Sequence, residues 1–159
     1  MATRKPMPGK KYFTVGEANA TLPLVRAIVR DVAELARDLR ERHERLGRFR
    51  PNDRNGGLSD AHQEELLQIQ AEVERGQERM QGYEAELKQL GVELKDYFTG
   101  LIDFPAWMNG RQVYLCWRLG EPEVAHWHEL DAGVAGRQKL MTRSGSRCGL
   151  PDGIVGQVC

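Results

Sequence analysis

The stretch VRAIVRDVAELARDL, residues 25–39, decides the fold, because its apolar residues recur at alternating steps of three and four. Residues with this spacing form a stripe along one side of an α-helix, which packs against another helix. The stripe resumes at Leu46 after a gap at Arg42. Its earlier members are Val25, Ile28, Val32, Leu35 and Leu39.

The start of this helical region is marked by Thr14 and Glu17. A threonine followed three residues later by a glutamate predicts a capping box, in which each side chain binds a free backbone N–H. Pro23 lies within the predicted helix. Because proline lacks an N–H and clashes with the preceding turn, we expect a kink or a break between a short first helix and a long second one.

A further helix is predicted from Ser59, as its N-cap, to about Leu90, with Gly91 as its C-cap. Its stripe lacks one apolar residue, at Gly76 or Gln77, and comprises Leu66, Ile69, Val73, Met80, Tyr83, Leu87 and Leu90. Two stripes of equal length joined by the loop RFRPNDRNGGLSD, residues 48–60, predict an antiparallel helical hairpin. A lone hairpin exposes one side of its stripe, so we expect a homodimer in which two hairpins form a four-helix bundle.

After Gly91 the pattern changes to short segments rich in β-branched and aromatic residues. They predict an antiparallel meander of strands at residues 101–104, 112–119 and 124–130, with a type I′ turn at Asn109-Gly110. Pro105 cannot donate to a sheet ladder, so the first strand is expected at an edge. The predicted class is α+β, mainly α. A single domain spans residues 12–140, with the hairpin at 14–90 and the sheet at 92–131, between disordered ends at 1–11 and 141–159.

Charge and cysteine content narrow the classes of function. Lys plus Arg and Asp plus Glu each total 23, which disfavours nucleic acid as a partner. No apolar stretch is long enough for a membrane span or a secretion signal, so a cytoplasmic protein without a membrane partner is expected. Three cysteines, an odd number, favour reduced thiols over a disulfide framework. Cys116, inside an apolar run, is interpreted as a small buried hydrophobe.

The segment VAHWHELDAG, residues 124–133, contains the main candidate metal ligands. His126 and His128 point to the same face of a strand, and two imidazoles with nearby acids favour a divalent transition metal, which we take as zinc, iron or manganese. Regular alternation sends Glu129 to the opposite face, whereas Asp131, at the strand end, can turn inward. Geometry alone therefore ranks His126, His128 and Asp131 above Glu129 as ligands.

The register of the strand pair leaves two arrangements open. If the turn near residues 120–123 has two or four residues, Trp117 pairs with His126 and Leu115 with His128. Both histidine rings are then buried on an apolar face, and Cys116 and Asp103 lie on the other face. A turn of three residues shifts the pairing by one and reverses this relation. Asp103, Cys116, His126 and His128 would then share one side and form a credible ligand set.

Four segments resemble an uncharacterised bacterial family known as a domain of unknown function. They are YFTVGEAN (12–19), LGVELKD (90–96), GLIDFPA (100–106) and VYLCWRLGEPEVAHWHELDAGVAGRQKL (113–140). The resemblance implies a long helical hairpin followed by a compact segment ending in the residues found here at 127–131, and it brings no established activity. At His126 this sequence departs from the family pattern, where tyrosine is common. The resemblance therefore shifts weight to His128, Glu129 and Asp131, with Glu93 and Asp103 as partners.

These observations support two alternative functions. The first is a cytoplasmic homodimeric protein that holds a divalent transition ion through the His/acid cluster, with metal-assisted hydrolysis as an activity to test. The second is a structural or adaptor protein without a metal, in which the hairpin binds a protein partner and the polar residues tie the sheet to the bundle.

Overall fold

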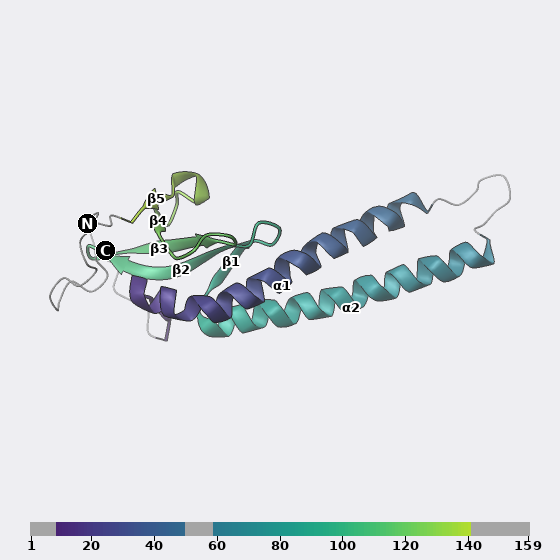
Figure 1. Cartoon of the computed structure of the whole chain (residues 1–159), viewed down its shortest axis with the longest axis horizontal. Coiled ribbons are helices and arrows are strands. Elements are labelled where there is room, and N and C mark those ends of the chain that lie inside the picture. The colour runs from purple at the N-terminus through teal and green to yellow at the C-terminus, as the bar shows by residue number, and fades with distance from the viewer. Residues whose placement is uncertain (1–8, 50–58, 141–159) are drawn as a thin grey trace.

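The computed structural model describes residues 9–49 and 59–140 and consists of a long helical hairpin with a small sheet at one end (Figure 1). The elements, in chain order, are α1 (Val15–Arg48), α2 (Asp60–Leu90), β1 (Glu93–Asp96), β2 (Leu101–Met108), β3 (Arg111–Arg118), β4 (His126–Glu129), the 3-10 helix η1 (Val134–Gly136) and β5 (Gln138–Lys139). This arrangement confirms the α+β class and the helical hairpin. The disorder predicted for residues 1–8 and 141–159, and the loop at 50–58, lie outside the described residues.

The predicted capping box begins α1. The Thr14 Oγ1 atom accepts a hydrogen bond from the Glu17 N–H at 3.1 Å, and Glu17 Oε1 accepts one from the Thr14 N–H at 3.3 Å. The helix then continues through Pro23, so a break at this residue is wrong. Because proline has no N–H, the carbonyl of Asn19, four residues earlier, loses its helical hydrogen-bond donor. Pro23 is exposed, so water can reach the backbone on this side of the helix.

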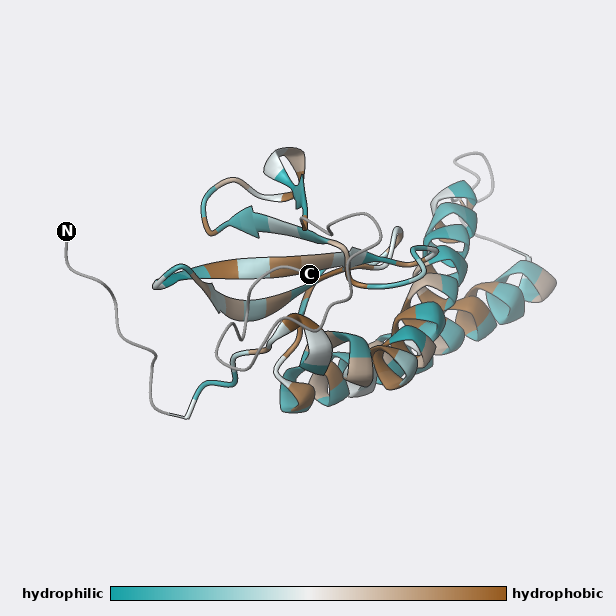
Figure 2. Cartoon of the chain, turned by 60° about the vertical axis from the view of Figure 1, so that its left-hand side comes forward, coloured by the Kyte–Doolittle hydropathy of each residue, from teal (hydrophilic) through white to brown (hydrophobic). Residues whose placement is uncertain are grey.

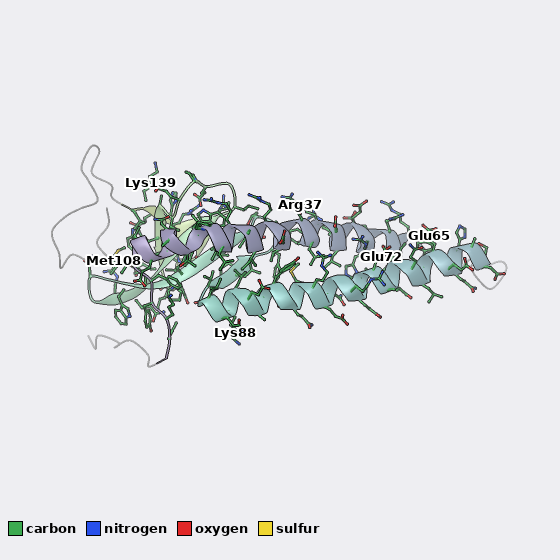
Figure 3. All side chains as sticks on the ribbon, turned by 60° about the horizontal axis from the view of Figure 1, so that its bottom comes forward. Arg37, Glu65, Glu72, Lys88, Met108 and Lys139 are labelled. Carbon is green, nitrogen blue, oxygen red and sulfur yellow. The ribbon has the colours of Figure 1, made fainter. Side chains whose placement is uncertain are left out.

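The two helices are in close contact at Gly76. A Cβ atom placed on Gly76 would lie 2.5 Å from Cδ2 of Leu39, so the missing apolar residue in the α2 stripe is a site of close helix contact. One turn beyond Leu39, at the gap in the α1 stripe, Arg42 Nε donates to Glu72 Oε2 at 3.0 Å. Figure 3 labels Glu72 on the part of α2 that extends past the sheet. The far part of the hairpin thus combines a narrow apolar seam with ion pairs.

The sheet has the strand order β1-β2-β3-β4-β5, and every pair is antiparallel. Because β1 pairs with the beginning of β2, the prediction that this strand is an edge is wrong. Pro105 is tolerated because it lies past the end of β1, where its carbonyl accepts a hydrogen bond from the Phe13 N–H at 2.7 Å. The turn at Asn109-Gly110 is confirmed, with φ values of 52° and 77°.

One face of the sheet packs against the hairpin and forms the main core (Figure 2). Residues 102, 104, 106 and 108 of β2 and 113, 115 and 117 of β3 are buried on this face together with apolar residues of α1. Because side chains alternate along a strand, the residues between them belong to the opposite face. That second face carries the polar residues of the sheet.

None of the helices in the described residues is long and apolar enough to cross a membrane.

Candidate metal centre

The pairing of β3 with β4 places Cys116 opposite His126 and Tyr114 opposite His128. This is the second of the two registers that the sequence left open. Asp103 of β2 is in turn opposite Cys116, so the three strands bring Asp103, Cys116 and both histidines to the face that points away from the helices.

The turn between β3 and β4 is fixed by Glu121. Its Oε1 accepts a hydrogen bond from the Arg118 N–H at 2.7 Å, and its carboxylate binds Nη2 of Arg137 at 2.8 and 3.0 Å. The Glu121 carbonyl accepts a further bond from Nε1 of Trp117 at 3.0 Å. These contacts hold the strand pair in the register that gathers the polar cluster.

Asp103, Cys116 and His128 form one compact group. A carboxylate oxygen, the Sγ atom and an imidazole nitrogen, one from each residue, all lie within 4.8 Å of one another. The residues are 2%, 0% and 3% exposed, respectively, so bulk water does not reach the group. Oxygen, thiolate sulfur and imidazole nitrogen are the three donor types that zinc binds in proteins.

His128 is held in one orientation by both ring nitrogens. Its Nδ1 lies 2.7 Å from the Glu129 carbonyl oxygen, which can only accept, so Nδ1 carries a proton. Its Nε2 lies 2.9 Å from Oδ2 of Asp103. A histidine that donates one N–H to a backbone carbonyl and presents the other nitrogen to a polar group has the arrangement common among metal-binding histidines.

One carboxylate oxygen of Asp103 lacks a hydrogen-bond partner among the described residues. Its Oδ2 contacts His128, but its Oδ1 is buried and has no hydrogen-bond partner within the described part of the chain. Burial raises the pKa of the Asp103 carboxyl above its usual value, although His128 and, to a smaller extent, the Cys116 thiol interact with the carboxyl and act to lower its pKa. A buried polar atom without a partner is uncommon in folded proteins and points to an unseen ion or water.

In the metal-free chain, the Cys116 thiol is protonated near neutral pH. Burial, followed by the charge of Asp103, raises the pKa of Cys116 to about 12. A thiol in this state is not a nucleophile near neutral pH. A bound cation would change this, because a coordinating thiol is deprotonated by the metal.

Two other sequence-predicted ligands share the face but lie outside the compact group. The Nδ1 atom of His126 lies 3.4 Å from Glu121 Oε2, close enough for an ion pair but without hydrogen-bond geometry. Burial and the nearby Arg137 lower the pKa of His126. Glu93, opposite Asp103, binds Nζ of Lys95 at 3.1 Å.

The remaining two predicted ligands lie apart from the cluster. Glu129 points away from it, as the alternation predicted, and both of its carboxylate oxygens bind the Arg111 guanidinium, with Oε2 at 3.2 Å from Nε. Asp131 is exposed in the turn that follows β4. The structure therefore brings Asp103 and His128 together and leaves Glu93, His126, Glu129 and Asp131 outside the group.

Cys116 belongs to the compact group, although the sequence pattern favoured a small buried hydrophobe at this position. It is buried, as the sequence predicted, but its side chain lies on the polar face rather than in the main core. The signal that pointed to it was the register alternative, in which Cys116 and Asp103 join the histidines. That alternative depended on the length of a turn, which the sequence left undecided.

Comparison with known proteins identifies the family. The comparison with curated proteins and the comparison with solved structures gave no match. A family described as "Uncharacterized conserved protein (DUF2203)" matches residues 11–140, which include both helices, the sheet and all three residues of the buried cluster. The chain therefore belongs to the DUF2203 family of uncharacterized conserved proteins.

Proposed function

We propose that this protein binds one divalent transition metal ion through Asp103, Cys116 and His128. The observation that carries the proposal is the buried Oδ1 atom of Asp103, which lacks a partner among the described residues, in a group that also contains a thiol and an oriented imidazole. Leaving such an oxygen unpaired costs about 1–3 kcal/mol. A cation that coordinated the carboxylate would remove this cost.

The donor set favours zinc among the three candidate metals. A thiolate is a soft ligand that suits zinc and iron, whereas manganese favours carboxylate, carbonyl and water oxygens. One nitrogen, one sulfur and one oxygen can occupy three corners of a tetrahedron around zinc. Iron is the second choice for the same donors, and manganese the last.

Three protein ligands leave a fourth coordination position without a side chain from the cluster. Catalytic zinc sites commonly have three protein ligands and a fourth position for water or substrate, whereas structural sites are closed by four. We therefore propose metal-assisted hydrolysis as the activity to test. Because all three ligands are buried, substrate would need a local opening of the second face of the sheet.

A metal-free scaffold is the competing function, and one contact favours it. The Asp103–His128 hydrogen bond at 2.9 Å joins β2 to β4 without an ion. A buried hydrogen-bonded pair of this kind can have a purely structural role, in which it specifies the packing of the sheet. In that case the protein would act through its hairpin, as an adaptor for a protein partner.

Cobalt binding distinguishes the two functions. The test uses a Cys148→Ser/Cys159→Ser protein, in which Cys116 is the only remaining thiol, after removal of metal with a chelator. Stoichiometric Co²⁺ should produce a sulfur-to-cobalt charge-transfer band in the near ultraviolet together with the visible bands of a tetrahedral ion. The additional change Cys116→Ser should abolish the charge-transfer band. A protein that takes up no Co²⁺, or that binds it without sulfur ligation, would favour the scaffold.

The assembly and location are proposed on separate grounds. The narrow seam of the hairpin supports a homodimer built as a four-helix bundle. The odd number of cysteines supports a reducing compartment such as the cytoplasm.

A further inference from the structure

A cavity of about 510 Å³ lies where residues 9–11 pass the C-terminal end of α2 and the edge of the sheet. Lys10 and Lys11 line it from the N-terminal segment, Lys88 from the last turn of α2, and Glu93 and Tyr114 from the sheet. Figure 3 labels Lys88 at the end of α2 that meets the sheet. The cavity therefore gathers residues from three separate parts of the chain.

The charge around this cavity is positive. Lys10, Lys11 and Lys88 take part in none of the salt bridges found among the described residues. The carboxylate of Glu93 is already paired with Lys95, whose Nζ also lies 5.3 Å from the centre of the Tyr114 ring. Three lysines that form no salt bridge among the described residues therefore line the cavity beside one carboxylate, which Lys95 already balances.

The helix end does not account for this charge. The C-terminus of a helix carries roughly half a negative charge, which a single cation in the last turn can balance. Lys88 occupies that position, and the Gly91 N–H already binds the carbonyls of Leu87 and Lys88. Lys10 and Lys11 come from a different segment, where their Nζ atoms lie 5.6 Å and 4.7 Å from the ring centres of Tyr12 and Phe13, respectively. These ring contacts leave both positive charges unneutralised.

Tyr114 forms the boundary between the cavity and the buried cluster. Its ring packs against the His128 ring, with 5.4 Å between the centroids, and it lines the cavity. The Tyr114 hydroxyl interacts with the Glu93 carboxylate, so the lysines are the groups that the cavity offers to a ligand. The inner wall of the cavity lies one side chain away from His128.

We infer that this cavity binds the anionic group of a small molecule, a phosphate or a carboxylate, through Lys10, Lys11 and Lys88. Ammonium groups bind such oxyanions as point charges without a fixed geometry, so both classes fit. The inference goes beyond metal binding, because the lysines attract an anion whether or not an ion occupies the cluster.

Calorimetric titration with inorganic phosphate and, separately, with succinate tests the inference. The full chain is used in two forms, metal-stripped and zinc-loaded with excess ion removed, at constant ionic strength. We expect saturable binding of at least one anion to both forms. A Lys10→Gln/Lys88→Gln protein should bind at least about tenfold more weakly, because two of the three ammonium groups that attract the anion are removed.

Lys139→Gln is the matched control, because Lys139 is exposed on β5, at the opposite edge of the sheet, and should leave the affinity unchanged. Stronger binding of phosphate than of succinate would identify a phosphate compound, and the reverse a carboxylate. The absence of saturable binding by either anion would overturn the inference. Binding confined to the zinc-loaded form and unaffected by the lysine changes would also overturn it, because the anion would then lie on the ion. Neither result depends on whether Co²⁺ binds to Cys116.

Discussion

The Nε2 atom of His128 lies 2.9 Å from Oδ2 of Asp103, in a pair that joins β4 to β2 at the covered second face of the sheet. The other nitrogen of His128 is engaged by a backbone carbonyl, whereas the other oxygen of Asp103 has no partner in the described ranges. This asymmetry distinguishes the pair from a fully satisfied polar contact. A change of charge at Asp103 is therefore expected to affect both the stability of the chain and the proposed metal binding.

Asp103→Asn is predicted to flatten the pH dependence of stability in the metal-free protein. Because burial raises the pKa of Asp103 in the folded state, the folded chain holds more protons than the unfolded chain from about pH 4 upward, and stability falls as pH rises through this range. The amide removes the buried charge and can still donate to His128. Its stability at neutral pH should equal the wild type or exceed it by up to about 1–3 kcal/mol.

Urea unfolding in the presence of a chelator, at a series of pH values, measures this effect. His128→Ala is the informative comparison, because it removes the partner but keeps the carboxyl group. An Asp103→Asn protein that is several kcal/mol less stable than the wild type near neutral pH would mean that the carboxylate is stabilised by its partner, against the prediction.

Zinc affinity is predicted to increase with pH. Since the pKa of Cys116 is raised to about 12, the thiol of the metal-free protein keeps its proton across the neutral range and must release it to bind zinc. The logarithm of the association constant should therefore increase by about one for each pH unit. Competition with a chelator of known affinity at several pH values gives this slope. Cys116→Ser should bind zinc more weakly, and an equally strong, pH-independent affinity in both proteins would contradict sulfur ligation.

Gly76→Leu is predicted to destabilise the hairpin by about 1–3 kcal/mol, because even its Cβ atom would lie 2.5 Å from Cδ2 of Leu39, so the side chains of the helix contact must shift to admit it. Gly82→Leu is the matched control on the same helix. A Cβ at Gly82 meets nothing within 4 Å, so this change should raise stability by up to about 1 kcal/mol through helix propensity. Chemical denaturation measures both. Equal effects of the two substitutions would show that Gly76 is not a point of close helix contact.

Light scattering coupled to size-exclusion chromatography tests the predicted homodimer. The chain has a mass of 18.0 kDa, and the dimer should have twice this value. Leu67 is 64% exposed on α2, and a second hairpin could cover it, so Leu67→Glu should shift the mass toward the monomer. A wild-type mass of one chain at every concentration would exclude the four-helix bundle.

The hairpin could be predicted because its signals are local. The three-and-four spacing of apolar residues, the Thr14 and Ser59 caps and the Gly91 C-cap each act within a few residues, and all are present in the structure. Pro23 misled the prediction because it lies at an exposed position of a helix that continues through it. The short strands β1 and β5 were missed, because four and two residues, respectively, are too few to show a period.

The candidate site could be predicted only in part, because it depends on how strands pair. The His-x-His spacing predicted that both histidines lie on one face of a strand, but it left open which face, and the alternation placed Glu129 on the other side. The joining of Asp103 and Cys116 to His128 depends on the turn held by Glu121 and Arg137, which are 16 residues apart in the sequence. Long-range contacts of this kind leave no periodic signal.

Elemental analysis of protein purified without a metal-affinity tag tests the metal centre most directly. The wild type and Asp131→Asn, whose side chain is exposed and lies outside the cluster, should each contain close to one zinc or iron per chain, whereas Cys116→Ser and His128→Ala should contain far less. A wild type that contains no transition metal, and takes up none after incubation with zinc under reducing conditions, would contradict the proposed metal centre.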